Sequence, residues 1–465
     1  MKKLIGLFRR PGAALRRLAP VPSCWHDQYS RTAAFLVRSD HWEAERIAAW
    51  QLRQLNHLLG HAFRHCRGHA RKLRAAGFCG CLERLEDLCG LPFFTKEELR
   101  TQGDEFIAEN RPSKTLRPIT SGGTTGTPTR FMVDAQTYDA VFDAWRHAMW
   151  RRAGYDLGAR ALDLTWAFSG GGLLRPSSDP SRIYLSIHAL DASAACDWWS
   201  RVRGFQPKFI VAFPSTATAF AKLVPAPGAM PDVRGLLLAS ETLTSDQSGV
   251  LRAAFPQARI FQWYGMSELA GFASGCEHAD TFHHWPQSGV LELIGEDGHP
   301  VQNPGESGEI VLTGFANLAT PFIRYRTGDR ATLGNRCPQC KRTHLVLTAI
   351  DGRLSDFLLG QQGRVVPISA LNFHSDEFRL VFAHQFVQEE PGRVVLRVVP
   401  LPGFTREDES AIIRLVGEKL GGDVKLTIEQ VTSIPRTPRG KQPLIVQRCP
   451  PARHHSGLIS ILSAP

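Results

Sequence analysis

Ser121-Gly-Gly-Thr-Thr-Gly-Thr-Pro128 combines three glycines and three threonines in one short stretch. Glycine lets the backbone approach an anion closely, and successive N–H groups in a turn form an anion-binding concavity. The stretch therefore favours a phosphate-binding loop, although a plain connection has a similar composition. It contains no GxGxxG, and the chain has no GxxxxGK[ST], so two common nucleotide-binding patterns are excluded. The candidate phosphate ligands are Ser121, Gly122, Gly123, Thr124, Thr125, Gly126 and Thr127.

Four more stretches follow this one along the chain: Gln262-Trp-Tyr-Gly-Met-Ser-Glu268, Arg324-Tyr-Arg-Thr-Gly-Asp329, Gly352-Arg-Leu-Ser-Asp356 and Pro435-Arg-Thr-Pro-Arg-Gly-Lys441. In this order and at these separations, the five stretches resemble the adenylate-forming (acyl-CoA synthetase) superfamily. The flanking sequence most resembles the phenylacetate-CoA ligase branch and the related CapK-like proteins of capsule biosynthesis. The resemblance covers roughly residues 45–446, which is nearly the whole chain.

The resemblance implies an AMP-forming acid–thiol ligase. Such an enzyme uses ATP and Mg²⁺ to convert a carboxylic acid into an acyl-adenylate, and CoA then takes the acyl group. It implies catalytic roles for Lys441 at the α-phosphate, Glu268 as the Mg²⁺ ligand and Arg353 at the ribose or phosphates. The nucleotide would further contact the ribose-binding Asp329 and an adenine-lining set formed by Ser240, Glu241, Thr242, Tyr264 and Gly265.

Two positions depart from the pattern of the superfamily. Many relatives carry Lys where Thr127 stands, so one cation of the phosphate grip is missing. The hinge before the C-terminal domain often carries Asp where this chain has Ser355, and Asp356 follows it. The second departure bears on the thioester-forming half-reaction.

An acyl pocket is suggested by aromatic residues near glycine-rich or proline turns. Trp166 and Phe168 precede Ser169-Gly-Gly-Gly172, and Phe213 precedes Pro214. These segments resemble the walls of the aryl pocket in the phenylacetate-CoA ligase branch. Aromatic residues in apolar runs also serve as ordinary core, so the acid itself stays unidentified.

A metal site is suggested by Cys337-Pro-Gln-Cys340, because two thiolates at C-x2-C spacing on a tight turn can bind one Zn²⁺. Cys276 and the nearby histidines can complete a Cys3His set. Resemblance to the family's structural zinc favours His283, while His284 and His278 stay open. The alternative is that these cysteines are free and buried.

The bulk composition is that of a globular protein with two domains: 465 residues, 43% hydrophobic and 21% charged. A net charge of +11 suits an anionic ligand such as ATP, or reflects Arg-rich coding. Dispersed basic residues without a base-stacking motif disfavour nucleic acid as a partner. Ten cysteines without a secretion signal argue against a disulfide framework and for a cytoplasmic protein, which we expect to be a monomer or homodimer.

The first 20 residues carry six basic residues and no acid. A short amphipathic helix there can contact an anionic membrane surface, and the alternative is a solvated terminus. Arg9-Arg-Pro11 interrupts the apolar stretch, so a secretory signal is not indicated, and no run of 18 apolar residues predicts a membrane-spanning helix.

Periodicity predicts an α/β fold with a β-rich subdomain and a small C-terminal α+β domain, and the resemblance implies that this domain is a mobile lid. Helices are expected over 42–78 and 137–153, and a helix follows a capping box at Thr95. Strands are expected over 161–168, 209–213, 233–239 and 259–263, with a turn at Asp351-Gly352. We expect a basic segment over 1–40, an adenylate-forming domain over 41–351, a lid over 352–448 and a tail over 449–465.

Two other functions fit the same residues. An adenylating enzyme can pass the acyl group to a carrier-protein thiol, an amine or a sugar amine. A zinc-bearing scaffold without catalysis is the non-enzyme alternative, and the presence of Glu268, Asp329, Arg353 and Lys441 disfavours it.

Overall fold

The protein is described by a computed structural model that covers residues 23–120, 129–165, 174–177, 179–186, 190, 195–353, 357–362, 364–367, 376–437 and 441–449. The chain divides into two compact units. Unit 1 consists of Met1–Ala159, Ser178–Ser181 and Phe261–Ile350, and unit 2 of Arg160–Ser177, Arg182–Ile260 and Asp351–Pro465. The domain limits expected from the sequence, 1–40, 41–351, 352–448 and 449–465, stay a prediction.

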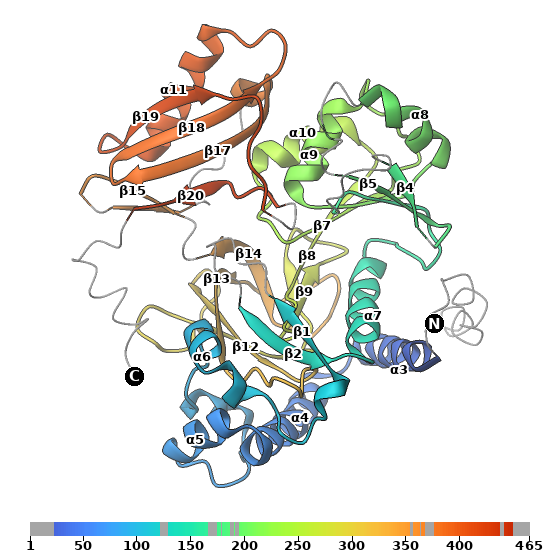
Figure 1. Ribbon diagram of the computed structural model, residues 1–465, viewed down its shortest axis with the longest axis vertical. Coiled ribbons are helices and arrows are strands. Elements are labelled where there is room, and N and C mark those ends of the chain that lie inside the picture. Colours follow the sequence, from blue (N-terminus) through green and yellow to red (C-terminus); the bar gives the residue numbers. More distant parts are fainter. Residues whose placement is uncertain are drawn as a thin grey trace. The chain divides into compact units, whose positions relative to one another are not determined.

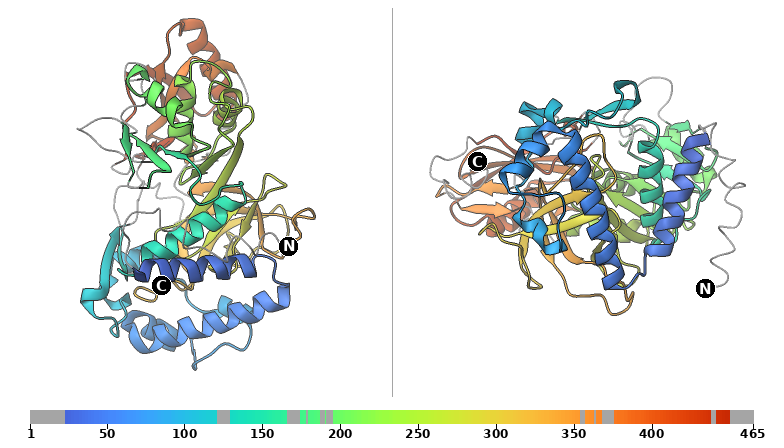
Figure 2. Two further views of the ribbon diagram at one scale, coloured as in Figure 1. Left: turned by 90° about the vertical axis from the view of Figure 1, so that its right-hand side faces the viewer. Right: turned by 90° about the horizontal axis from the view of Figure 1, so that it is seen from below.

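The helices of unit 1 are α3 (Ser23–Ser39), α4 (Ala44–His65), α5 (Arg67–Ala75), α6 (Lys96–Thr101) and α7 (Tyr138–Arg151), with 3-10 turns at Leu85–Gly90, Gly103–Phe106 and Ser113–Thr115. Helix α3 packs along α7, and Leu36 contacts the cluster around Trp145 and Met149 (Figure 2). The capping box predicted at Thr95 is confirmed, because its side chain accepts a hydrogen bond from the Glu98 amide at the start of α6.

The single helix predicted over 42–78 is wrong, because the chain breaks between α4 and α5. Cys66 adopts an extended conformation, with φ −125° and ψ 107°, and its side chain is buried. The break redirects α5, so that Gly68 lies directly against Phe106. A Cβ atom at position 68 would stand 2.8 Å from that ring, which explains why the second residue of this helix is glycine.

The strands of unit 1 form a hairpin and a larger sheet (Figure 1). The hairpin pairs β1 (Leu116–Thr120) with β2 (Arg130–Asp134), so the stretch 121–128 connects these two strands. In the sheet the order is β11-β12-β13-β14-β10-β9-β8. Its members are β8 (Arg259–Gly265), β9 (Phe272–Gly275), β10 (Phe282–His284), β11 (Gly289–Ile294), β12 (Ser307–Gly314), β13 (Tyr325–Leu333) and β14 (Val346–Arg353).

Unit 2 contains a mostly parallel sheet in the order β7-β6-β3-β5-β4. Its strands are β3 (Ala161–Asp163), β4 (Leu174–Pro176), β5 (Arg182–Leu185), β6 (Phe209–Ala212) and β7 (Gly235–Ala239). The helices α8 (Ala195–Phe205), α9 (Pro214–Leu223) and α10 (Ser245–Ala254) supply apolar side chains to the same core. The continuous apolar runs of β6 and β7 fit strands that are covered on both faces.

The C-terminal part of unit 2 is a small α+β layer (Figure 1). Its sheet has the order β19-β18-β17-β20, from β17 (Val381–Glu390), β18 (Arg393–Pro400), β19 (Lys425–Gln430) and β20 (Ile445–Gln447). Helix α11 (Arg406–Leu420) buries Ile412, Val416 and Leu420 in the core of this layer. A hairpin of β15 (Phe357–Leu359) and β16 (Val365–Pro367) and a 3-10 turn at Asp376–Phe378 complete it.

The predicted α/β class is confirmed, and two local predictions are wrong. Asp351-Gly352 makes no turn, because β14 continues through both residues to Arg353. Gly352 has a φ of 83° there, a value that glycine adopts without steric cost, so the strand is kept where a turn was expected. The strand predicted from Ala161 ends at Asp163. Among the described residues, no helix has the length and apolar character needed to cross a membrane.

Candidate functional site

Tyr264 and Asp329 meet in unit 1. Tyr264 lies near the end of β8, and Asp329 follows Gly328 in β13, where the register with β12 shifts at a bulge. The phenolic oxygen donates a hydrogen bond of 2.7 Å to Asp329 Oδ2. Burial, and then the charge of Asp329, raises the pKa of Tyr264 well above its usual value, so the phenol stays a proton donor. The structure thus brings the predicted base-contacting and ribose-binding residues together.

The backbone around Asp329 is fixed by a carboxylate from the neighbouring strand. Glu309 of β12 accepts hydrogen bonds from the Gly328 amide, at 3.0 Å, and from the Arg326 guanidinium. The Asp329 amide donates to Thr327 Oγ1 at 3.0 Å. Gly328 has a φ of 76°, which glycine tolerates. These bonds hold the backbone of the β13 bulge that carries Asp329.

Arg324, at the start of the same motif, has a structural role. It forms a bidentate ion pair with Glu292 at 3.0 and 2.9 Å, and it donates to the carbonyls of Cys89 and Leu91. Both Arg324 and Arg326 also lie against the ring of Phe93. The arginines of this motif are therefore occupied in supporting the part of β13 that carries Asp329.

Glu268 is buried, with 5% of its surface exposed, in the loop after β8. The hydroxyl of Tyr138 donates a 2.8 Å hydrogen bond to the carbonyl of Ser267 and so supports this loop from α7. Tyr138 carries no sequence signal for this role, because its partner is a backbone atom 129 positions away. Sequence reasoning therefore missed it.

Unit 2 brings Glu241 and the segment of Lys441 together. The Gln442 amide donates a 2.8 Å hydrogen bond to Glu241 Oε1, and the two residues are 201 positions apart. Lys441 Nζ lies 6.0 Å from the centre of the Phe213 ring. Two predicted nucleotide-site segments and one predicted pocket residue thus converge within one unit.

Backbone strain, seen as a positive φ at a non-glycine residue, occurs at several of these predicted segments. Among the described residues, positive φ at a non-glycine residue occurs at Ser240 (72°), Leu269 (56°) and Arg324 (46°), besides Gln206 and Lys341. The first three lie in or next to the predicted adenine, magnesium and ribose segments. Such strain persists where surrounding structure fixes it, and it is common at ligand-binding sites.

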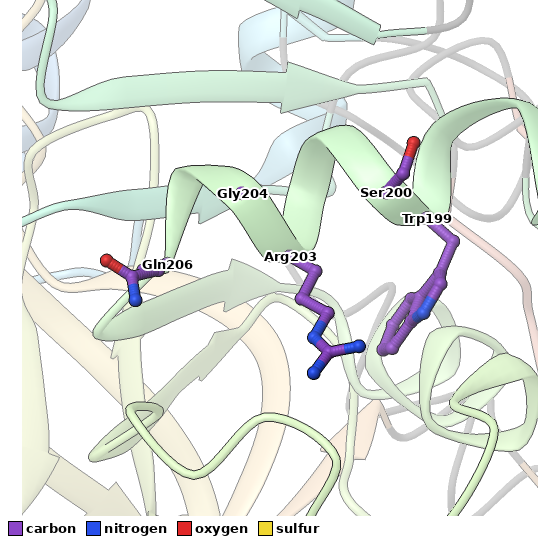
Figure 3. A pocket seen from close by; sticks show the side chains of 5 residues that line it. All are labelled: Trp199, Ser200, Arg203, Gly204 and Gln206. Atoms are coloured by element: carbon purple, nitrogen blue, oxygen red, sulfur yellow. The ribbon is translucent and has the colours of Figure 1, made fainter.

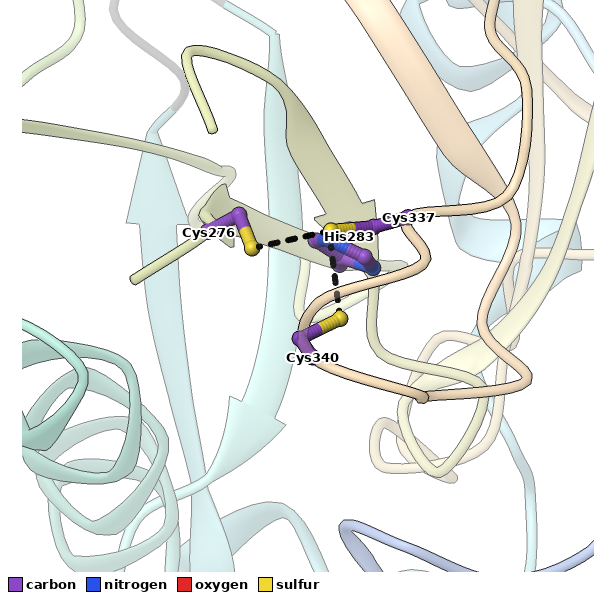
Figure 4. Close-up of side chains that lie close together, drawn as sticks. All are labelled: Cys276, His283, Cys337 and Cys340. Carbon is purple, nitrogen blue, oxygen red and sulfur yellow. Dashed lines mark hydrogen bonds between the residues drawn. The ribbon is translucent and has the colours of Figure 1, made fainter. Parts of the chain in front are cut away.

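Cys276, His283, Cys337 and Cys340 form a buried cluster in unit 1 (Figure 4). Their ligand atoms all lie within 4.8 Å of one another. Cys276 Sγ and Cys337 Sγ are 3.7 Å apart, and Cys340 Sγ and His283 Nε2 are 3.6 Å apart. Of the three histidines considered from the sequence, this group contains only His283.

Buried charges surround this cluster. Arg342, just after Cys340, pairs with Asp40 at 2.8 Å and with Glu277 at 2.6 Å, and Arg152 pairs with Asp40 at 2.6 Å. Burial alone would raise the pKa of Asp40, but the charges and hydrogen bonds of the two arginines outweigh it and hold that pKa well below its usual value. The C-x2-C turn is thereby tied to the chain just after α3.

Several predicted residues lie outside the described part of the chain. These are the whole phosphate-binding stretch, Ser121, Gly122, Gly123, Thr124, Thr125, Gly126 and Thr127, and the pocket residues Trp166 and Phe168. For Arg353 the structure describes the backbone, at the end of β14, and not the side chain. Thr242 and Gly265 are described, next to Glu241 and Tyr264.

A shallow hollow of about 410 Å³ lies elsewhere, on α8 (Figure 3). It is lined by Trp199, Ser200, Arg203, Gly204 and Gln206, none of which was predicted to bind a ligand.

Comparison with solved structures defines the class of fold. A 2-hydroxyisobutyryl-CoA ligase in its postadenylation state aligns with a TM-score of 0.71 at 19% identity, covering 92% of this chain and 94% of that one. The fold is therefore that of an adenylate-forming ligase.

The family follows from the sequence comparison. The family model of the AMP-binding enzymes matches residues 67–320, which is more than half of the chain, so the protein belongs to the AMP-binding enzyme family. The CapK C-terminal domain model matches residues 358–448. A phenylacetate-coenzyme A ligase of Thermus thermophilus is 26% identical over 70% of this chain and 74% of its own length. Protein CapK of Staphylococcus aureus is 23% identical over 76% of this chain and 78% of its own length.

Proposed function

We propose that the protein is an ATP-dependent, AMP-forming acid–thiol ligase that adenylates a carboxylic acid and transfers the acyl group to CoA. The observation that carries the proposal is the meeting of Lys441 with the Glu241 segment in unit 2, since a lysine beside an adenine-lining segment suits charge stabilisation at an α-phosphate. Membership of the AMP-binding enzyme family and the likeness to a phenylacetate-coenzyme A ligase support it.

Residues of unit 1 are proposed to hold the nucleoside and the metal. Asp329 would accept hydrogen bonds from the ribose hydroxyls, and the ring of Tyr264 would stack on adenine. The Tyr264–Asp329 hydrogen bond suits both roles, because it fixes the carboxylate and the ring in one geometry. Arg353 is proposed to reach the ribose or the phosphates, and the stretch 121–127 to bind phosphate oxygens.

Mg²⁺ is proposed to bind Glu268. A hard carboxylate oxygen is the donor that Mg²⁺ prefers, and the ion usually keeps several waters and phosphate oxygens as its other ligands. Glu268 is buried in the loop that directly follows β8, close in sequence to the proposed adenine-contacting Tyr264. Bound Mg²⁺ neutralises phosphate charge in reactions of this class.

Lys441 is proposed to act at the reacting centre. Its ammonium would interact with the α-phosphate while the carboxylate oxygen of the acid attacks phosphorus and pyrophosphate leaves. In the second step the CoA thiol attacks the acyl carbon and AMP leaves. Phe213 is proposed to contribute to the acyl pocket, since the centre of its ring lies 6.0 Å from this ammonium.

A structural Zn²⁺ is proposed for Cys276, His283, Cys337 and Cys340. In a tetrahedral site with Zn–S of about 2.3 Å and Zn–N of about 2.1 Å, sulfurs stand about 3.8 Å apart and sulfur and nitrogen about 3.6 Å apart. The distances of 3.7 Å between Cys276 and Cys337 and 3.6 Å between Cys340 and His283 fit these values. Four protein ligands leave no open position, which is typical of a structural zinc.

A different acceptor is the second candidate function. The C-terminal residues 358–448 match the CapK C-terminal domain, and this part of the chain carries Lys441. We therefore keep a carrier-protein thiol, an amine or a sugar amine as the alternative to CoA.

ATP–pyrophosphate exchange with a panel of carboxylic acids tests the proposal. Exchange that depends on an aryl acid, followed by consumption of CoA, is the expected result. Exchange without CoA consumption would support the second candidate function, in which the acceptor is not CoA. Absence of exchange with every acid, from folded protein loaded with Zn²⁺ and Mg²⁺, would contradict adenylation.

A further inference from the structure

The carboxylate of Glu241 is occupied by hydrogen bonds from two distant segments. Its Oε2 accepts from the Ser215 amide at 3.0 Å, and its Oε1 accepts from the Ser215 hydroxyl at 3.1 Å and the Gln442 amide at 2.8 Å. All three donors are protein groups. The side chain of Glu241 is thus used in contacts within the protein. The contact with adenine that the resemblance implies for this segment would therefore come from the backbone of Glu241 and from the neighbouring residues.

The N-terminus of α9 favours an anion at this point. Pro214, the first residue of the helix, has no N–H, so the Ser215 amide is the first free donor of the helix. The partial positive charge at a helix N-terminus stabilises a carboxylate placed there. Burial raises the pKa of Glu241, and the hydrogen bonds from Ser215 and Gln442 and the charge of Arg436 oppose that rise, so these donors favour the ionised carboxylate.

The Lys441 segment, which begins at Arg436 and ends at Gln442, is hydrogen-bonded to the Ser215–Glu241 pair at both of its ends. On one side Arg436 Nη1 donates to Ser215 Oγ at 3.2 Å, and on the other the Gln442 amide donates to Glu241. Between them, the Lys441 amide donates to Thr437 Oγ1 at 3.1 Å, and the Thr437 amide donates to the Lys441 carbonyl at 2.8 Å. Position 441 is thus fixed from both sides.

The two elements that carry these contacts are also joined at a second point. Lys222, near the end of α9, donates to the carbonyl of Phe382 at 3.1 Å and to that of Val381, in β17. Gln442 Nε2 donates to the carbonyl of His384 in the same strand at 3.1 Å. Helix α9 and β17 therefore hold Ser215 and Gln442 at a defined separation.

We infer that the Ser215–Glu241 pair holds the Lys441 segment in place, and we call this pair the seat of the segment. Glu241 is thereby a positioning residue for Lys441. It acts through the Gln442 amide and the Arg436–Ser215 contact, and it does not need to touch the reacting atoms. The consequence for catalysis rests on the proposed function. The seating itself does not, because it is a property of the folded chain alone.

Limited proteolysis tests the seating without any substrate. Trypsin can cleave after Arg436, Arg439 and Lys441 once the segment leaves its seat, and mass spectrometry distinguishes the three cuts. In Glu241→Gln an amide N–H meets a protein donor, so we expect cleavage at these three sites to accelerate by about tenfold. Ser215→Ala removes only the hydroxyl contacts and is expected to give a smaller increase. The matched control is Glu429→Gln, an exposed partner of Arg397, which should cleave at the wild-type rate.

Separate half-reactions test the consequence. In Glu241→Gln, ATP–pyrophosphate exchange should fall by about tenfold through kcat, while transfer from supplied acyl-adenylate to the acceptor is retained. Should Glu241→Gln fail to fold, Ser215→Ala carries both measurements. Unchanged cleavage after Arg436 and Lys441 in a folded variant overturns the inference. If the wild type adenylates no acid, the proposed function fails, and the proteolysis result still decides the seating.

Discussion

The Tyr264 hydroxyl donates a 2.7 Å hydrogen bond to the carboxylate of Asp329, which lies 65 positions further along the chain. Tyr264 lies near the end of β8 and Asp329 lies at the bulge in β13, so the bond joins two of the five motifs that identify the family in the sequence. A polar bond between two proposed ligand-binding residues thus orients both of them.

Tyr264→Phe should weaken ATP binding more than turnover. The ring is kept, but Asp329 loses a fixed donor, and hydrogen bonds to charged groups contribute about 1.5–3 kcal/mol. We expect roughly a tenfold rise in the KM for ATP in pyrophosphate exchange, with a smaller change in kcat. Tyr184→Phe, in β5, is the control and should leave the KM unchanged. A variant with wild-type KM would show that Asp329 needs no help from Tyr264.

Much of the fold could be predicted from the sequence because the signals were local. Apolar runs gave the strands β6, β7 and β8, and the Thr95 capping box gave the start of α6. The break at Cys66 could not be predicted, since it depends on the distant ring of Phe106 packing on Gly68. The turn predicted at Asp351-Gly352 was wrong because the positive φ of Gly352 lies inside strand β14.

The candidate site was predictable as a set of motifs and not as a set of contacts. The sequence pointed to Tyr264, Asp329 and Glu241, but it gave no sign that the first two bond to each other. The segment Ser240–Thr242 was expected to line adenine, and in the structure the side chain of Glu241 accepts hydrogen bonds from Ser215 and Gln442. These hydrogen bonds join residues about 25 to 200 positions apart, and a single sequence does not show which distant residues are in contact.

Lys441→Ala should lower the rate of adenylation by roughly 100-fold, because the variant loses a cation at the developing charge of the transition state. The readout is ATP–pyrophosphate exchange with the best acid of the panel. Lys425→Ala, at the exposed start of β19, is the control and should exchange at the wild-type rate. ATP–pyrophosphate exchange at the wild-type rate in Lys441→Ala would contradict a catalytic role for Lys441.

Cys340→Ser should abolish the bound zinc. Purified protein is expected to contain about one Zn²⁺ per chain by elemental analysis, and the variant close to none, because one of four ligands is lost. Since a structural metal contributes folding energy, the variant should unfold at a lower urea concentration. Cys89→Ser, an exposed cysteine outside the cluster, should keep its zinc and its unfolding midpoint. Wild-type protein without zinc, purified free of chelators, would contradict the site.

Asp40→Asn should destabilise unit 1, because Arg152 and Arg342 would lose the carboxylate that both of them bind. Breaking a buried ion pair on one side costs about 3–5 kcal/mol, while an exposed pair contributes less than about 1 kcal/mol. Asp139→Asn, whose carboxylate pairs with Arg117 at the surface, is therefore the control in urea unfolding at pH 7. Equal midpoints for the two variants would contradict a special role of Asp40.

The same comparison has a defined pH dependence. The pKa of Asp40 is lower in the folded protein than its usual value of 3.8, so its ionised form stabilises the fold above that pH. As the pH falls below about 4, the unfolded chain takes up the proton first, and this contribution is lost progressively. The gap in unfolding free energy between wild type and Asp40→Asn should therefore be full at pH 5 to 7 and shrink toward pH 3. Protonation of the zinc ligands affects both proteins alike and cancels in the difference, so a gap that stays constant down to pH 3 would place the stabilisation in packing and not in charge.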